Sequence, residues 1–231
     1  MKRSIQLSSL AAAVALSAAA LVPAVANAGT SATVGVSNFY LFRGLDLSNP
    51  NAQVSGSVDY THDSGAYAGV WASNSGTGTS GEYDLYVGYA TQIAGVSVDA
   101  NLTSYEYPQA AGNNKLGSIS EFILNLGYDL GTMGKASFGV AQSLQGETLT
   151  TGYQYYTLGY SLDKMSATLG IQQYGASAAN NYTHLDLGYA VNDEVSVTLS
   201  QIIDQDAKRA DAGFIDKDVK INLAWSKKFD F

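Results

Sequence analysis

Apolar and polar residues alternate along most of this sequence with a period of two. The clearest segment interleaves two sets of side chains: Tyr83, Leu85, Val87 and Tyr89 on one face, and Asp84, Tyr86, Gly88 and Ala90 on the other. The same alternation runs through residues 121–130 and 219–231. A period of two indicates β-strands, because successive side chains of a strand point to opposite sides. The pattern therefore predicts an all-β protein.

The alternating segments form a repeated hairpin. Five of them end in Tyr, at Tyr60, Tyr89, Tyr128, Tyr160 and Tyr189, with spacings of 29, 39, 32 and 29 residues. We expect short connections after these tyrosines, at residues 61–64, 91–95, 131–134, 163–164 and 192–194. Longer polar connections, at residues 74–81, 108–118 and 204–217, separate the hairpins. Alternating short turns and long loops are typical of outer-membrane barrels, in which the short turns face the periplasm.

The strands can be counted from this repeat. Five hairpins give ten strands, one more precedes them at about residues 31–43, and one follows at about residues 218–231. The total of twelve is even, as single-chain bacterial barrels require. The sequence thus predicts a transmembrane antiparallel up-and-down β-barrel of about twelve strands, with both chain ends on the periplasmic side.

The N-terminal segment has the organisation of a signal peptide. A cationic start of Met1, Lys2 and Arg3 precedes the apolar run 10–22, and Ala26-Asn27-Ala28 supplies a small-x-small cleavage pattern. The alternative is a membrane-spanning helix, but the run is short and rich in Ala, and a span needs about 20 predominantly apolar residues. We therefore expect residues 1–28 to be a cleaved signal peptide, with cleavage near Ala28, and residues 29–231 to form the barrel.

Composition narrows the classes of protein further. The chain has no Cys, which excludes a lipoprotein anchor and disulfides. Its net charge of −8 becomes −10 once Lys2 and Arg3 are removed, so nucleic acid is not an expected partner. The acidic balance fits either a preference for cations or plain solubility. Beyond residue 28 no apolar stretch approaches the length of a membrane helix, so a membrane location requires a closed barrel.

The aromatic residues also favour a membrane location. Each of the five repeat tyrosines lies at the turn end of its strand on the apolar face, where Tyr forms girdles at the membrane interface. The chain ends in Phe231, on a face with Trp225 and Phe229 that only Lys227 interrupts. This ending resembles the C-terminal signal that the barrel-assembly machinery recognises. The alternative is a soluble β-sandwich or barrel, which has no reason to place Tyr at the same end of five hairpins.

The N-terminal region resembles a known family. Residues 38–44 (NFYLFRG) followed by residues 52–74 are similar to the signature of the TorF-type porins, small proteobacterial barrels. The matching residues are Tyr40, Phe42, Arg43, Gly44, Gly56, Tyr60, Gly65, Tyr67, Gly69, Trp71, Ser73 and Asn74. The resemblance is strongest over residues 31–90, and it implies an outer-membrane location and a pore. It implies no particular substrate.

The alternation also assigns residues to the lumen, the interior of the barrel. The expected pore-lining residues are Arg43, Asp59, Asp84, Asp99, Glu121, His184, Asp186 and Lys220. Arg43 has two interpretations, since it either tunes a pore or pairs with an inward carboxylate and fills the interior. The strand that contains Trp71 can be read with either face towards lipid.

An enzyme is not expected. A barrel phospholipase would need a Ser–His pair near the lipid, but His184 faces the lumen and His62 lies in a turn. No second His lies near either one, so we expect no metal site, and no cofactor is expected.

Three functional hypotheses follow. The first is an outer-membrane pore for passive diffusion of small hydrophilic solutes that favours cations, with membrane lipid and the assembly machinery as its partners. The second is a closed structural or adhesive barrel that acts through its outer loops. The third is a soluble secreted β-protein.

Overall fold

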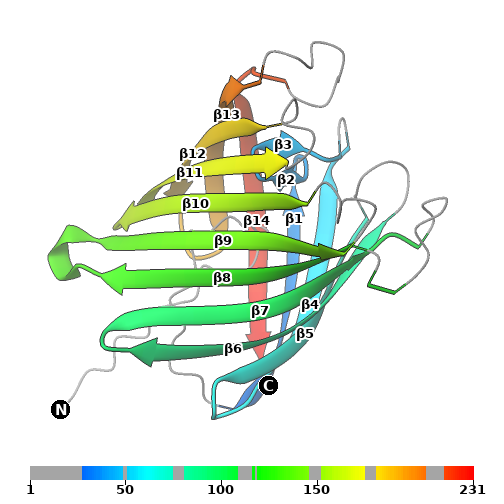
Figure 1. Ribbon diagram of the computed structural model, residues 1–231, viewed down its shortest axis with the longest axis vertical. Coiled ribbons are helices and arrows are strands. Elements are labelled where there is room, and N and C mark those ends of the chain that lie inside the picture. The colour runs from blue at the N-terminus through cyan, green and yellow to red at the C-terminus, as the bar shows by residue number, and fades with distance from the viewer. Residues whose placement is uncertain are drawn as a thin grey trace.

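The computed structural model describes residues 28–48, 51–74, 81–108, 116–117, 119–145, 152–174, 181–206 and 216–231. Within these residues, twelve strands form one closed antiparallel barrel (Figure 1), which confirms the predicted fold class and strand number. The predicted signal peptide, residues 1–28, lies outside the described residues except for Ala28. The wall strands are β1 (Gly29–Ser37), β4 (Gln53–Thr61), β5 (Ala66–Ser73), β6 (Glu82–Ile93), β7 (Val96–Glu106), β8 (Ile119–Asp129), β9 (Lys135–Gln145), β10 (Tyr153–Leu162), β11 (Met165–Tyr174), β12 (Tyr182–Ala190), β13 (Val195–Gln205) and β14 (Lys220–Asp230).

The two ends of the barrel differ in their connections. Tight turns join the strands at one end, here called the turn end, and both β1 and β14 reach it: Gly29 pairs with Thr61, and Phe231 N donates to Thr30 O over 2.9 Å. The turn predicted at residues 91–95 is shorter, because β6 continues to Ile93 and only Ala94 and Gly95 remain. Both have positive φ, 51° and 84°, as a two-residue hairpin turn requires. The opposite end is called the loop end.

The barrel is apolar outside and polar inside. On β1, Val34 and Val36 are exposed on the outer face, whereas Thr33 and Ser37 are buried inside. Among the buried described residues other than glycine, 22 are polar or charged and 11 are apolar, the reverse of a soluble protein core. This pattern suits a wall that faces lipid, and it argues against the soluble alternative. No helix in the described part of the chain is long and apolar enough to cross a membrane.

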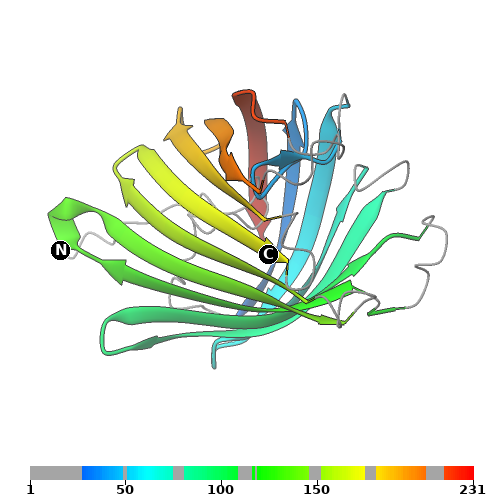
Figure 2. The same ribbon diagram turned by 45° about the horizontal axis from the view of Figure 1, so that its top comes forward.

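The first strand, predicted at residues 31–43, is shorter than predicted at its C-terminal end. β1 stops at Ser37, and the chain then leaves the wall and forms a short hairpin of β2 (Leu41–Phe42) and β3 (Leu45–Asp46). Arg43 and Gly44 form its turn with φ values of 49° and 80°. Figure 2 shows this blue hairpin on the concave side of the wall. Phe39, Tyr40 and Leu41 are buried there, because the lumen removes their apolar surface from water.

An asparagine side chain continues the wall where the backbone departs. Asn38 Nδ2 donates to Ile221 O over 2.8 Å, and Asn38 Oδ1 accepts from Leu223 N over 2.8 Å. The carboxamide thus presents one donor and one acceptor to β14, as a strand residue would. The seam between β1 and β14 is therefore satisfied beyond Ser37, although the chain itself has turned inward.

Candidate functional site

The hairpin of β2 and β3, here called the lumen hairpin, is anchored by Arg43 in its turn. The Arg43 guanidinium donates two hydrogen bonds to Glu121 on β8, from Nη1 to Oε1 over 2.9 Å and from Nη2 to Oε2 over 2.7 Å. Tyr105 on β7 donates its hydroxyl to the same Oε2 over 2.8 Å. Side-chain exposure is 4% for Arg43 and 1% for Glu121. Of the two interpretations of Arg43, the structure thus shows the pairing with an inward carboxylate.

Aromatic rings enclose the same guanidinium. Arg43 Cζ lies 4.4 Å from the ring centroid of Tyr155 on β10 and 4.7 Å from that of Phe42. Ring faces attract cations at these distances. We call the wall residues Glu121, Tyr105 and Tyr155 the guanidinium cage: Glu121 and Tyr155 contact the guanidinium, and Tyr105 holds Glu121.

His184 supports one side of the cage. Its Nδ1 lies 3.0 Å from Asp186 Oδ1, and its Nε2 lies 2.8 Å from the Tyr155 hydroxyl. The two ring nitrogens of His184 thus link the Asp186 carboxyl group to the Tyr155 hydroxyl. The Tyr155 and His184 rings are stacked at an interplanar angle of 3°. A Cβ on Gly44 would lie 2.6 Å from His184 Cβ, so the hairpin turn rests directly on this histidine.

A second polar cluster lies on strands β4–β7. The hydroxyl of Tyr67 donates to Asp99 Oδ2 over 2.9 Å, and that of Tyr86 donates to Asp59. Tyr67 therefore faces the lumen with Gly69 and Trp71, which resolves the ambiguity over the two faces of that strand. The Trp71 ring lies 5.8 Å from the ring of Tyr40 in the hairpin.

Two carboxylates near the loop end are only partly satisfied. Glu82 accepts from the Tyr107 hydroxyl over 3.1 Å through Oε1. Its Oε2 and the Oδ1 of Asp84 are buried and have no hydrogen-bond partner in the part of the chain that the structure describes. The charged residues of the wall are also unevenly distributed. Strands β4–β8, whose residues are all described, contain seven carboxylates and no Lys or Arg.

The predicted lumen residues face the interior as the alternation predicted, but one of them, Arg43, comes from a different element. The side chains of Asp84, Asp99, Glu121, His184 and Asp186 are buried inside the barrel. Asp59 is half-buried beside them, and Lys220 lies at the loop end, where it donates to Asp216 O over 2.8 Å. Arg43 enters the lumen from the hairpin and not from a wall strand, which corrects the prediction. Whether any of them lines an open pore stays a prediction.

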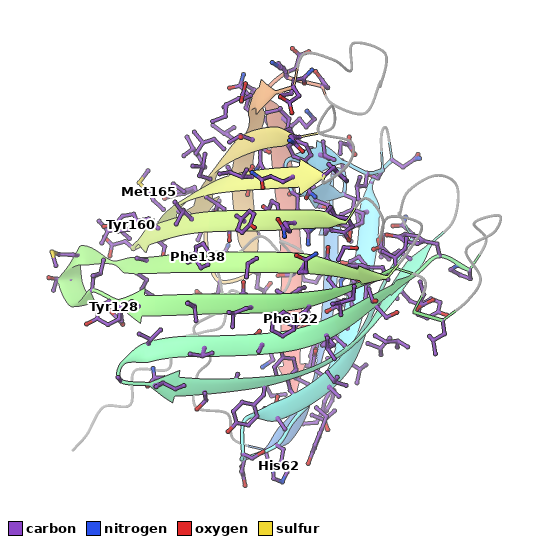
Figure 3. All side chains as sticks on the ribbon, in the orientation of Figure 1. His62, Phe122, Tyr128, Phe138, Tyr160 and Met165 are labelled. Atoms are coloured by element: carbon purple, nitrogen blue, oxygen red, sulfur yellow. The ribbon has the colours of Figure 1, made fainter. Side chains whose placement is uncertain are left out.

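The predicted interface tyrosines lie on the outer face near the turn end. Tyr60, Tyr89, Tyr128, Tyr160 and Tyr189 are each about half exposed there. Figure 3 shows Tyr128 and Tyr160 close to the tight turns, with Phe122 nearer the other end.

Lys227, the interruption of the C-terminal apolar face, has an ionic partner. Its Nζ lies 3.0 Å from Glu194 Oε1, and Trp225 Nε1 donates to Glu194 Oε2 over 2.9 Å. The hydrogen bond from Lys227 lowers the pKa of Glu194, and the bond from Trp225 adds to this effect. Phe229 lies further along the same strand, Phe231 directly follows it, and both are exposed. Their role as an assembly signal stays a prediction.

The remaining histidine makes only local contacts. His62 lies in the β4–β5 turn, labelled in Figure 3, with Nδ1 3.0 Å from Ser64 Oγ and accepting from Ser64 N. The described residues hold no group of three or more His, Asp or Glu side chains suited to a metal ion.

The sequence did not identify the hairpin or the role of Tyr105 and Tyr155. One signal was present: residues 39–42 (FYLF) are apolar on both faces, which breaks the alternation. No comparable signal marked the two tyrosines, because their importance depends on what lies across the lumen.

Solved structures with a similar fold include porins and an outer-membrane protein. The KdgM porin is 7% identical with a TM-score of 0.49, covering 87% of this chain and 99% of its own. The NanC porin is 9% identical with a TM-score of 0.49, covering 85% and 97%. The outer membrane protein Omp33 of Acinetobacter baumannii is 11% identical with a TM-score of 0.43, covering 88% and 98%. Because these TM-scores are below 0.5, the strand number and topology are established only by the hydrogen bonds between this chain's own strands.

Comparison with curated proteins gives no match. A family described as "Bacterial protein of unknown function (Gcw_chp)" matches residues 23–226. The TorF-type name suggested by residues 38–74 is not confirmed by this match. Because the match spans most of the sequence, the chain belongs to the bacterial Gcw_chp family.

Proposed function

We propose that this protein spans the outer membrane of a Gram-negative bacterium and acts as a narrow channel for passive diffusion of small hydrophilic solutes. The observation that carries the proposal is the inverted burial of the wall, with Val, Leu and Phe outside and carboxylates and hydroxyls inside. Lipid stabilises such an outer band, and a polar interior favours water and polar solutes.

The uneven charge of the interior supports a preference for cations. Asp59, Asp84 and Asp99 face the lumen from strands that carry no Lys or Arg. Arg43 adds little positive field, because Glu121 neutralises it at 2.7 Å. Rings of carboxylates raise the local concentration of cations and lower that of anions.

The lumen hairpin limits the size of the solute. It crosses the loop-end half of the interior and contacts β5, β8 and β12 through Tyr40, Arg43 and Gly44. A twelve-strand barrel is intermediate between side-chain-filled and open barrels, so a hairpin inside it leaves only a narrow path. We therefore expect a small conductance.

Planar-bilayer recording with the purified, folded protein tests the channel. We expect small conductance steps, and in a KCl gradient a reversal potential on the cation-selective side. The double variant Asp59→Asn/Asp99→Asn should move the reversal potential towards zero, whereas Asp193→Asn, in an exposed turn, should leave it unchanged. Anion selectivity of the wild type would contradict the cation preference.

A closed structural or adhesive barrel is the second candidate, and the anchored hairpin favours it. Bidentate pairing of Arg43 with Glu121 would keep such a plug in place. The same recordings decide between the two candidates. An absence of steps at any voltage, in the wild type and in Arg43→Ala, would reject the channel in favour of the closed barrel.

A further inference from the structure

The lumen contains a cation-binding arrangement that one of the protein's own side chains fills. We infer that the guanidinium cage of Glu121, Tyr105 and Tyr155 is a solute-binding site for guanidinium groups, which Arg43 occupies as an internal stand-in. This inference rests on the proposed channel, since solutes must enter the lumen to reach the cage. It adds a class of recognised solute: small molecules that carry a guanidinium group.

The geometry fits a guanidinium better than an ammonium ion. Both oxygens of Glu121 accept from Arg43, at 2.9 and 2.7 Å, which needs two parallel N–H groups on one planar cation. The ring of Tyr155 lies 4.4 Å from the guanidinium carbon, so a flat cation gains contact that a compact ammonium does not. A lysine-like solute could satisfy one oxygen at a time.

The cage does not depend on the hairpin for its shape. Glu121, Tyr105 and Tyr155 come from β8, β7 and β10, and these strands are fixed by the hydrogen bonds of the wall. Tyr155 is also held by His184, which Asp186 orients in turn. Groups locked by neighbours in this way remain arranged for a ligand when the stand-in leaves.

The backbone pairing within the hairpin, in contrast, is short, so its turn can move without unpairing a wall strand. β2 and β3 pair through only two residue pairs, Leu41 with Asp46 and Phe42 with Leu45. Arg43 itself has φ of 49°, a conformation that is unfavourable for a residue other than Gly. Its buried Nε has no hydrogen-bond partner among the described residues. If Arg43 left the cage, its backbone could relax from the positive φ and its Nε could reach water. The solute would then supply the cation that Glu121 needs.

Tethering sets the concentration at which a solute competes. A group on a short flexible segment acts at an effective concentration in the millimolar range, so free guanidinium must approach about millimolar levels to displace it. Removal of Arg43 should therefore expose the cage to solute at lower concentrations.

Titration calorimetry on folded protein in detergent tests the site directly, with L-arginine and L-lysine as the probes. We expect Arg43→Ala to bind arginine at least about tenfold more tightly than lysine, since lysine lacks the planar fork. The double variant Arg43→Ala/Glu121→Gln should lose arginine binding. Lys164→Ala, which removes a cation in the exposed turn between β10 and β11, is the matched control and should bind like the wild type.

A second variant covers the case in which Arg43→Ala does not fold because Glu121 is left unpaired. Gly44→Ala pushes the turn away from His184 but leaves every cage residue in place, so it should bind arginine as well. Heat-modifiable mobility on gels verifies folding of each variant. Equal affinity for arginine and lysine, or arginine binding that survives Glu121→Gln, would overturn the inference.

Bilayer recordings separate this inference from the proposed channel. In Arg43→Ala, arginine should reduce the potassium current in a saturable way, and lysine should do so only at higher concentrations. Selective binding by calorimetry without any current would reject the channel and keep the site. A current that arginine and lysine affect equally, with no calorimetric preference, would reject the site and keep the channel.

Discussion

Three ring-bearing residues of the lumen lie flat over glycines of the neighbouring strand. Tyr86 pairs with Gly69, Tyr67 with Gly88, and His184 with Gly170. A Cβ at Gly69 would lie 2.5 Å from the Tyr86 ring, and the other two glycines are approached at least as closely. The missing side chains let the rings lie along the wall and direct their polar atoms to Asp59, Asp99 and Tyr155. The guanidinium cage and the second polar cluster, on β4–β7, thus both depend on glycine.

Gly170→Ala should be destabilising. The new methyl group would lie 2.5 Å from the Tyr155 hydroxyl and closer still to His184 Nε2, so the stacked pair must separate. We expect a loss of about 1–3 kcal/mol, as for other overpacked sites. Urea unfolding in lipid vesicles, followed by tryptophan fluorescence, measures it.

The companion change His184→Ser tests the cause. A smaller side chain at this position should make room for the new methyl group, so the double variant should lose less stability than the two single changes add up to. Strict additivity of the two losses would contradict the proposed clash.

At the scale of elements, asparagine side chains complete strands that end early. Asn38 bridges to β14 where β1 turns into the lumen. Asn74, directly after β5, accepts from Val54 N over 2.7 Å and donates to Ala52 O over 3.2 Å. In both places a carboxamide supplies the donor and acceptor that the next backbone unit would have offered. At the loop end the backbone can therefore leave the wall while the neighbouring strand keeps its hydrogen-bond partners.

Replacing Asn38 should weaken the closing seam. Asn38→Leu removes three side-chain hydrogen bonds to β14, with Ile221 O, Leu223 N and Asn222 Nδ2, and should cost about 1–3 kcal/mol of unfolding free energy. Asn38→Asp, which still accepts from Leu223 N but cannot donate to Ile221 O, should lose less. The midpoint of urea unfolding in vesicles measures both.

Asn51→Leu, at an exposed position of the same connection, is the matched control for this series. It should leave the midpoint near that of the wild type. A loss at Asn51 equal to that at Asn38 would mean that the effect comes from added apolar surface and not from the seam.

At the scale of the whole molecule, the barrel separates two environments, and its two tryptophans report on them. Trp71 faces the lumen against Tyr40, whereas Trp225 lies on the outer face near the turn end, bonded to Glu194. The five repeat tyrosines mark the same outer rim. In a membrane, the lipid should therefore reach one tryptophan and not the other.

Brominated lipids test this sidedness. In vesicles of brominated phosphatidylcholine, the Trp71→Phe variant, which retains Trp225, should show strong fluorescence quenching. The Trp225→Phe variant, which retains Trp71, should show little. Equal quenching of both variants would contradict the assigned inside and outside of the wall.

Local regularities of the sequence determined the strands, their number and their sidedness. Alternation assigned Asp84, Glu121 and His184 to the interior, and the repeated Tyr located the turn end. These properties are local, because the period of a strand and the chemistry of a turn depend on neighbouring residues. The first strand was predicted too long because residues 39–42 share the apolar character of a wall strand without its alternation.

Only the tertiary structure decided which interior residues meet. Arg43 and Glu121 are 78 residues apart, and Tyr155 and His184 are 29 apart, so neither pair leaves a local pattern in the sequence. Their contacts depend on the closure of the barrel and on the path of a hairpin that leaves the wall. The sequence by itself therefore determined a twelve-strand barrel with a polar interior. Closure of the wall in three dimensions decided that a tethered arginine fills a cage there, because atoms on different strands converge only across a closed lumen.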